Sequence, residues 1–522
     1  MSTNTIIVLA AFVAYMGIMI LIGALNSKNK NNEDYFLGGR GLGSWTAALS
    51  AQASDMSGWL LMGLPGAIYV AGTGEIWIAI GLLIGTILNW MIVARRLRKY
   101  TIVANNSLTI PSFFENRFHD KKGVLKIVAS IVIIVFFAVY TASAFVSGAK
   151  LFRNVFGQGA DDKTAYIIGL IVATVVILVY TLLGGFRAVC YTDFIQGLLM
   201  LVAILAVPII AYISISGDLS GALASSTAGA GTEDAITSVS GFLSLFQNKD
   251  GSSVTFVSVI SNLGWALGYF GMPHILVRFM AIKSDKEVKK SRIIAIVWVI
   301  LSLGAASFLG LVARGYLSED LIAGKNSESV FIKTIQQIFS GNVVLVFIGG
   351  IFLCGILAAI MSTADSQLLV TASSVSEDMY KGVIKKDASE KSALNVGRIA
   401  VAVTAVVAFL IALDENSSVM DLVSDAWAGF GAAFGPVILL SLFWKRFNLS
   451  GAAAGMITGF LTIIVWDYIP FGEQTLAKST GLYSLVLGFA LALIVAVVVT
   501  LITKAPSKEV TDEFEKVNTV EI

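Results

Sequence analysis

Cysteine and histidine are almost absent from this chain, with two of each among 522 residues. A disulfide scaffold or a Cys/His metal centre needs several such residues at close spacing, so the sequence supports neither. Cys190 and Cys354 fall in apolar segments, where a thiol ordinarily acts as a small buried hydrophobe. The sequence also contains no GxxxxGK[ST] phosphate-binding loop and no nucleophile–base constellation. We therefore predict neither an enzyme nor an ATP-driven pump.

Charged residues are also few, at 13% of the chain, whereas 56% of the residues are hydrophobic and the mean hydropathy is +0.83. The net charge of +2 is too small to indicate a nucleic-acid partner. Apolar stretches of about 20 residues, the length that crosses a bilayer, recur along the chain. We predict an all-α integral membrane protein with about thirteen transmembrane helices, at 5–25, 45–71, 75–94, 124–153, 164–184, 189–215, 254–278, 292–316, 342–379, 395–413, 419–444, 450–469 and 480–503.

Lysine and arginine divide unevenly between the two sides that these helices define. Twenty-eight of the 36 basic residues fall in loops on one side, which the positive-inside rule assigns to the cytoplasm. This places the N-terminus outside and the C-terminus inside. The first apolar run has no basic residues before it and is long enough to span, so we expect a retained helix and not a cleaved signal.

The helices fall into two groups of five, and the odd number makes the second group inverted relative to the first. Each group begins with a segment interrupted by glycine and proline, which points to a transport site at the membrane midplane. The interrupting residues are Gly58, Gly63 and Pro65 in the first group and Gly264, Gly268, Gly271 and Pro273 in the second. The expected parts are a first helix and cytoplasmic loop (1–44), the first repeat (45–215), an extracellular loop (216–253), the second repeat (254–444), two C-terminal helices (445–503) and a charged, partly disordered cytoplasmic tail (504–522).

Asp55 lies inside the first interrupted segment, next to Ser57 and Gly58. A carboxylate within a bilayer costs roughly 2.5 kcal/mol or more, so it indicates a functional site. The alternative is a kinked helix in which Asp55 pairs with another buried polar group. A broken helix exposes unpaired backbone N–H and C=O groups, and glycine allows a ligand to approach the backbone. The carbonyls of Ala53 and Met56 are therefore candidate ligands for a cation.

A second polar cluster lies on the ninth span, where Ala359, Ser362, Thr363 and Ser366 recur at helical spacing and share one face. Hydroxyl and carbonyl oxygens with little carboxylate charge suit a hard, singly charged cation such as Na+. The alternative is that the hydroxyls bond only to their own helix.

Two further acidic residues, Asp193 and Asp365, lie on the sixth and ninth spans. Two interpretations stay open: they line a cytoplasmic ion exit or a second ion site, or each is a helix-end carboxylate paired with a basic loop.

The second interrupted segment carries Trp265 and Tyr269, which share a helix face four residues apart, followed by Pro273 and His274. Such an aromatic face packs on a small aliphatic ring or a cationic amine. Packing within the bundle is the alternative. Tyr140 is a weaker candidate on its chemistry alone, and we interpret His274 as packing at a helix end.

Five stretches of the sequence resemble the solute:sodium symporter family, and together they extend over nearly the whole chain. They are EDYFLGGR from Glu33, SAQASDMSGWLLMGLPG from Ser50, YTASAFVSGAKLF from Tyr140, WALGYFGMPHILVRF from Trp265 and ILAAIMSTADSQLLV from Ile356. The first and last fit the family broadly, and the other three are similar to its proline-transporting branch. The resemblance implies a LeuT-like inverted repeat of five plus five helices, with one helix before it and two after.

The same resemblance implies roles for individual residues. The Na+ site would use the carbonyls and hydroxyls of Ala53, Met56, Ala359, Ser362 and Thr363. The substrate pocket would comprise Asp55, Ser57, Gly58, Tyr140, Trp265, Tyr269 and Pro273, with Asp55 also needed for coupling. Relatives with a second Na+ place an acid and extra hydroxyls where this chain has Asp193, Asp365 and Ser366, and the Asp365 carboxylate departs from that pattern.

The expected function is Na+-coupled uptake of L-proline by alternating access across the bacterial inner membrane. The implied partners are Na+, L-proline and the lipid bilayer, with no obligate protein partner and no nucleic acid. Alternatives are symport of another small zwitterion or of pantothenate, a non-transporting sensor on the same scaffold, and H+ in place of Na+ through protonation of Asp55.

Overall fold

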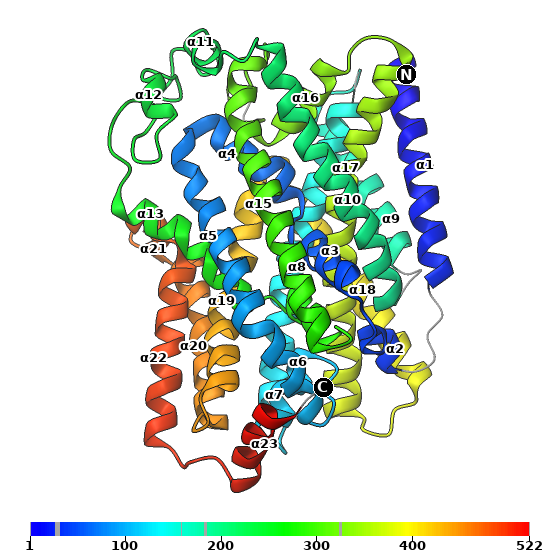
Figure 1. Ribbon diagram of the computed structural model, residues 1–522, viewed down its shortest axis with the longest axis vertical. Coiled ribbons are helices and arrows are strands. Elements are labelled where there is room, and N and C mark those ends of the chain that lie inside the picture. Colours follow the sequence, from blue (N-terminus) through cyan, green and yellow to red (C-terminus); the bar gives the residue numbers. More distant parts are fainter. Residues whose placement is uncertain (1, 27–31, 158, 182–184, 323–325, 521–522) are drawn as a thin grey trace.

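The computed structural model describes residues 2–26, 32–157, 159–181, 185–322 and 326–520, and it is a bundle of mostly upright helices (Figure 1). Within this described part, eleven helices are long and apolar enough to cross a membrane. They are α1 (Thr3–Asn26), the run Thr73–Val103 with α5 (Ile76–Leu88) and α6 (Ala94–Val103), α8 (Val124–Phe156), α9 (Asp162–Thr181), α10 (Phe186–Ser214), α15 (Asp285–Tyr316), the run Val343–Ile384 with α17 (Val343–Ser373), α18 (Glu390–Ile411), α19 (Val419–Phe443), α20 (Leu449–Tyr468) and α22 (Ser484–Ile502).

Two further apolar segments are broken where the sequence predicted interruptions. The first consists of α3 (Ser44–Asp55), a π-helical turn at Trp59–Gly63 and α4 (Leu64–Ala71). The second consists of α13 (Phe256–Leu263), a 3-10 segment at Gly264–Phe270 and α14 (Pro273–Met280). The positions of the predicted spans agree with these elements, although the count of thirteen and the repeat boundaries remain predictions. The last residues of span 164–184 lie outside the described residues.

Burial separates central from peripheral helices. The apolar window of α19 is 83% buried, against 33% for α1, α18, α20 and α22. The broken helix α3 lies against α10, α14, α15 and α17, while α8 lies against α9, α17, α18 and α19. The interruptions in α3/α4 and α13/α14 are therefore enclosed by long helices, which positions them as the interior site of the bundle.

Short elements cover the two ends of the bundle. One end carries α11 (Leu219–Ala224), α12 (Val239–Phe242) and α16 (Val330–Ile338), and the other carries α2 (Asn32–Leu37), α7 (Ile110–Phe118) and α23 (Lys508–Thr519) (Figure 1). A two-residue hairpin, β1 (Pro470–Phe471) with β2 (Gln474–Thr475), and α21 (Leu476–Thr480) connect α20 to α22. The start of α1 and helix α23 lie toward opposite ends in Figure 1.

The C-terminal tail is an ordered helix, so the expectation of partial disorder was wrong for its described residues. Val510, Phe514 and Val517 are buried on one face of α23. The guanidinium groups of Arg96 and Arg117 lie over the Phe514 ring at 5.0 and 5.4 Å. Three apolar residues at helical spacing pack this segment against the bundle. Its many charged residues had made disorder the expectation from the sequence.

Candidate functional site

The first broken helix ends at Asp55 because the backbone of Met56 is not helical (φ −83°, ψ 76°). The Met56 N–H bonds to the Gln52 carbonyl, so the carbonyls of the following residues are left for other partners. The Asp55 carbonyl accepts from Ser57 N at 3.0 Å, and the Ala53 carbonyl faces α17. The predicted break therefore presents carbonyl oxygens within the buried core.

The ninth-span hydroxyl face meets this break directly. The Ser362 hydroxyl donates to the Ala53 carbonyl at 2.7 Å, and the Thr363 hydroxyl lies 3.5 Å from the same oxygen. Ser362 Oγ is also 3.3 Å from the Ala359 carbonyl and 2.8 Å from that of Ala358. All of these residues are fully buried. The structure thus brings together Ala53, Ala359, Ser362 and Thr363, four of the five expected cation ligands.

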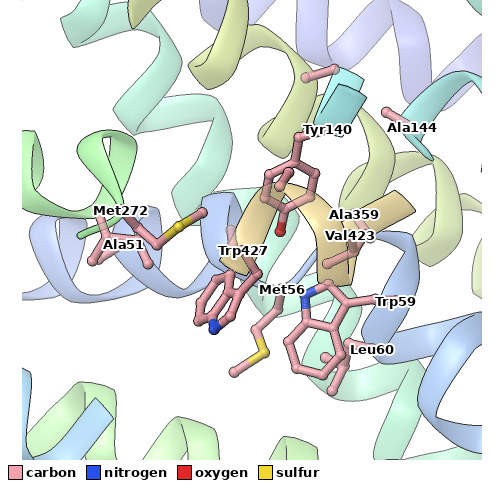
Figure 2. Packing of buried hydrophobic residues seen from close by; sticks show 14 of the residues in the cluster. Ala51, Met56, Trp59, Leu60, Tyr140, Ala144, Met272, Ala359, Val423 and Trp427 are labelled. Atoms are coloured by element: carbon pink, nitrogen blue, oxygen red, sulfur yellow. The ribbon is translucent and has the colours of Figure 1, made fainter. Parts of the chain in front are cut away.

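Met56, the fifth expected ligand, lies beside the same break. Figure 2 shows the ring of Tyr140 directed toward Met56 and Trp59. The Tyr140 hydroxyl lies 3.4 Å from the Asp55 carbonyl, which Trp59 Nε1 also approaches at 3.0 Å. Tyr140, the weaker candidate, is thereby placed at the centre of the site.

The Asp55 carboxylate is fully buried and only half engaged. Its Oδ2 accepts from the Tyr269 hydroxyl at 2.7 Å. Its Oδ1 has no hydrogen-bond partner within the described part of the chain. This contact joins the two broken segments, as expected for Asp55 and Tyr269 in one pocket. It also leaves one carboxylate oxygen available to a cationic group.

The second broken segment bends over an indole from α19. The Trp427 Nε1 donates to the Trp265 carbonyl at 2.8 Å, and its ring meets Tyr269 edge-on with centroids 5.0 Å apart. A Cβ at Gly268 would collide with this indole. Glycine is therefore required at this position because the Trp427 ring contacts the backbone.

Trp265 itself stacks on Tyr483, with ring centroids 5.3 Å apart and planes at 24°. Tyr483 precedes α22, outside the two predicted repeats, and its hydroxyl donates to the Ser424 carbonyl at 2.7 Å. Sequence reasoning missed both Trp427 and Tyr483, because their proximity to Trp265 depends on tertiary packing.

Two expected pocket residues have other neighbours. A Cβ at Gly58 would collide with the Ser147 side chain on α8, so glycine there allows helix packing. Pro273 opens α14 and lines a cavity with Arg278, Thr109 and Asp378. No contact in the described structure shows a role for either in binding a ligand. The Ser57 Oγ lies 3.4 Å from the Trp59 N–H at the break.

Asp193 lies in a buried ionic cluster that the sequence did not predict. Arg278 Nη2 is 3.1 Å from Asp193 Oδ2 and 2.5 Å from Ser366 Oγ. Its Nε donates to Ser50 Oγ at 3.2 Å, and Ser50 in turn donates to Asp193 at 2.7 Å. The guanidinium thus lies between two of the residues considered for a second ion. The feature of the sequence that could have indicated this cluster is Arg278, a single arginine at the end of the expected span 254–278.

Asp365 belongs to the same buried region. Its Oδ1 is 3.4 Å from the Ser366 hydroxyl, and its Oδ2 has no hydrogen-bond partner among the residues that the structure describes. It lines a small cavity with Tyr180 and Thr192. Both carboxylates are fully buried, and the basic partner of Asp193 is Arg278 of α14, not a residue of a loop.

Polar contacts fasten both ends of the bundle around this interior. At the end that carries α16, Glu328 pairs with Lys150 at 2.5 Å and accepts from the backbone N–H groups of Val419 and Met420, each at 3.0 Å. The start of α19 is thereby bound to α8 and to the 3-10 turn Ser327–Ser329, which directly precedes α16.

At the opposite end, Arg40 donates to the carbonyls of Met280 and Ser107, each at 2.8 Å. Burial lowers the pKa of Arg40 to about 10, and nearby Glu33 opposes this shift. Gly38 and Gly39 both have positive φ, at 59° and 65°, which accounts for the paired glycines before this arginine.

Comparison with known proteins relates these features to a family. The model of the sodium:solute symporter family matches residues 35–459. The osmoregulated proline transporter OpuE and the high-affinity proline transporter PutP, both of Bacillus subtilis strain 168, are each 46% identical to the chain over 95% of its length, and the matches cover 94% and 98% of those proteins. A sodium/proline symporter of Escherichia coli strain K12 is 43% identical over 97% of the chain and 95% of its own length.

Solved structures share the fold. A Na+-coupled sialic acid symporter in a substrate-bound outward-open state gives a TM-score of 0.74 at 21% identity, covering 96% of this chain and 98% of that one. MhsT in complex with L-phenylalanine gives a TM-score of 0.53 at 15% identity, covering 87% and 97%. These likenesses confirm the predicted LeuT-like architecture.

Proposed function

Because the chain belongs to the sodium:solute symporter family, we propose that it takes up L-proline together with Na+ across the cytoplasmic membrane of a bacterium. Its relatives at 41–46% identity are named proline transporters or sodium/proline symporters, so the chain is a transporter and not an enzyme. Na+ enters as a co-transported substrate and not as a resident cofactor. The observation that carries the proposal is the contact of Ser362 and Thr363 with the Ala53 carbonyl, beside the Asp55–Tyr269 hydrogen bond.

We assign Na+ to the space between the end of α3 and α17. The Ala53, Met56 and Ala359 carbonyls and the Ser362 and Thr363 hydroxyls would supply its oxygen ligands. In the structure the Ser362 hydroxyl donates a hydrogen bond to the Ala53 carbonyl. Na+ would replace this hydrogen bond, because both oxygens must then direct lone pairs at the ion. The ion would thereby hold the broken helix against α17.

Proline is a zwitterion with a small aliphatic ring, and the site offers complementary groups. The free Oδ1 of Asp55 would receive the secondary ammonium group. The aromatic faces of Trp265, Tyr269 and Tyr140 would enclose the ring, together with Trp427. Because Asp55 lies between Ala53 and Met56 in the chain, the ion and the ammonium group would share one backbone break. Coupling is reciprocal, so proline must raise the affinity for Na+ by the same factor.

Transport would proceed by alternating access, with the two five-helix repeats moving relative to each other around the buried site. The basic residues assign the end with α7 and α23 to the cytoplasm. On this orientation Glu328 and Lys150 fasten the outer end and Arg40 fastens the inner end. Substrate and ion would then enter past α16 and leave past α7.

The buried arginine favours one Na+ per cycle over two. Arg278 already places a positive charge between Asp193 and Ser366, where a second ion was considered. Asp365 Oδ2 has no hydrogen-bond partner among the described residues, so this cluster is a route for ion exit in our proposal. The ratio of Na+ to proline fluxes in proteoliposomes measures this stoichiometry.

Accumulation of labelled proline by proteoliposomes tests the function. We expect accumulation with an inward Na+ gradient and none with a K+ gradient of the same size. Accumulation that does not depend on the Na+ gradient would refute Na+ coupling. Accumulation driven by an imposed pH gradient in the absence of Na+ would indicate H+ coupling instead. Proline binding without accumulation would indicate a sensor. Na+-driven accumulation of labelled pantothenate but not of labelled proline would show that pantothenate is the substrate.

A further inference from the structure

His274 is a buried polar side chain that the site described above does not use. It is the second residue of α14 and is fully buried. Neither ring nitrogen has a hydrogen-bond partner in the part of the chain that the structure describes. An imidazole carries one donor and one acceptor when neutral, and leaving both unpaired in a protein interior is costly. Such a group calls for a partner that enters the site.

The surroundings place this imidazole at the junction of the two breaks. Its ring centroid lies 6.0 Å from that of Tyr140, edge-on, and 5.6 Å from that of Phe137. The Tyr140 hydroxyl in turn reaches the carbonyl of Asp55, the last residue of α3. His274 therefore lies against Tyr140 near the break after α3, where sequence reasoning had expected only packing at a helix end.

The two broken helices give the pocket opposite electrostatic ends. Helix α3 finishes at the break, so the negative end of its dipole and the Asp55 carboxylate face the pocket. Helix α14 begins at the other break with Pro273, so the positive end of its dipole coincides with His274. A zwitterion is stabilised when its ammonium group lies toward the first end and its carboxylate toward the second.

We propose that His274 is a substrate-binding residue that donates a hydrogen bond to the carboxylate of the transported amino acid. This assignment rests on the proposed function and deepens it. Asp55 Oδ1 receives the ammonium group, and His274 with the N-terminus of α14 receives the carboxylate. Asp55 and His274 together bind both charged groups of the substrate. The site therefore discriminates against analogues that lack either the ammonium group or the carboxylate.

Two substitutions separate hydrogen bonding from packing. H274F fills a similar space without a donor, and H274Q keeps an N–H donor. A hydrogen bond to a charged group corresponds to roughly ten- to a hundredfold in affinity. For H274F we expect the KM for proline to rise by about this factor, with maximal rate and half-saturating Na+ within about twofold of wild type. H274Q should recover most of the affinity.

L-Prolinamide, which lacks the carboxylate, supplies the specificity readout. The preference of the wild type for proline over prolinamide should fall in H274F by the same factor as the affinity for proline, and it should persist in H274Q. An unchanged KM and preference in H274F would overturn the assignment. So would equal losses for proline and prolinamide in both variants, because packing alone would then explain them.

A measurement on the unaltered side chain covers the case in which a variant fails to fold. The chain has two histidines, so a protein labelled at histidine gives two imidazole signals, and H119N identifies the signal of His119. Proline with Na+ should shift the His274 signal, and prolinamide should shift it less. Equal shifts would overturn the assignment. Wild-type vesicles that fail to accumulate proline would refute the proposed function as well, whereas accumulation with an indifferent His274 refutes this inference alone.

Discussion

Thr363→Val isolates the contribution of one hydroxyl to Na+ binding. The side chain is fully buried, and its hydroxyl makes a long 3.5 Å contact with the Ala53 carbonyl. Valine keeps the branched shape and removes the oxygen. Because so long a hydrogen bond stabilises little, we expect the ion-free protein to lose under about 1 kcal/mol of its free energy of unfolding. Loss of a Na+ ligand should instead weaken ion binding about tenfold, or about 1.4 kcal/mol.

Linkage converts this change into a measurable stability. An ion present at 100 times its Kd stabilises the native protein by about 2.7 kcal/mol. If Thr363→Val raises the Kd tenfold, the same Na+ concentration stabilises the variant by only about 1.4 kcal/mol. The assay is thermal unfolding of the purified protein as a function of Na+, alongside the Na+ dependence of proline uptake in proteoliposomes.

Thr371→Val is the matched control on the same helix. Thr371 is equally buried, and its hydroxyl bonds to the Gln367 carbonyl of its own helix at 2.9 Å. This substitution should destabilise the ion-free protein by about 1 kcal/mol and leave the Na+ response unchanged. The reasoning is refuted if both variants respond to Na+ alike.

Three further outcomes follow from the structure. Trp265→Ala removes an aromatic ring from the proposed pocket and should raise the KM for proline about tenfold, roughly 1.5 kcal/mol. The half-saturating Na+ concentration should change little. An unaltered KM for proline speaks against the pocket assignment. Glu328→Gln breaks the buried pair with Lys150 and should lower the free energy of unfolding by about 3 kcal/mol, so an unshifted melting temperature contradicts that role. The native cysteines are buried, so cysteines introduced at Thr3 and Lys508 report the orientation in the membrane. A membrane-impermeant maleimide added to intact cells should label the cysteine at position 3 and leave the cysteine at position 508 unlabelled. The reverse pattern would show the opposite topology.

The parts of the site that could be predicted are those marked by residues close to one another in the sequence. Glycine and proline clustered within an apolar run favour a break in a membrane helix, so both interruptions could be predicted. The hydroxyls of Ser362 and Thr363 recur at helical spacing, which defined their common face without knowledge of the fold. Asp55 stood out because a carboxylate is rare in a bilayer. The Ser362 contact with Ala53 confirms that the two regions meet, while the ligand roles remain predictions.

The parts that escaped prediction depend on contacts between distant segments. Trp427 lies in a run of small apolar residues and resembled packing, until the fold brought it against Gly268 and Trp265. Tyr483 lies beyond the repeats, where no periodicity connects it to the pocket. In α23 the charged residues outnumbered the buried Phe514, and only its spacing with Val510 and Val517 signalled a helix with an apolar face.

The docking of α23 has a consequence for how the chain matures. Helix α23 follows α22 in the chain, so it is synthesised after the eleven candidate membrane spans of the described residues. Until α23 arrives, Arg96 and Arg117 have no Phe514 ring to cover them, and Lys445 lacks its ion-pair partner Glu515. The end of the bundle that carries α7 and α23 is therefore completed only when α23 docks. A premature stop before α23, or a fusion that displaces this helix, therefore leaves Arg96, Arg117 and Lys445 without these contacts on an otherwise assembled bundle.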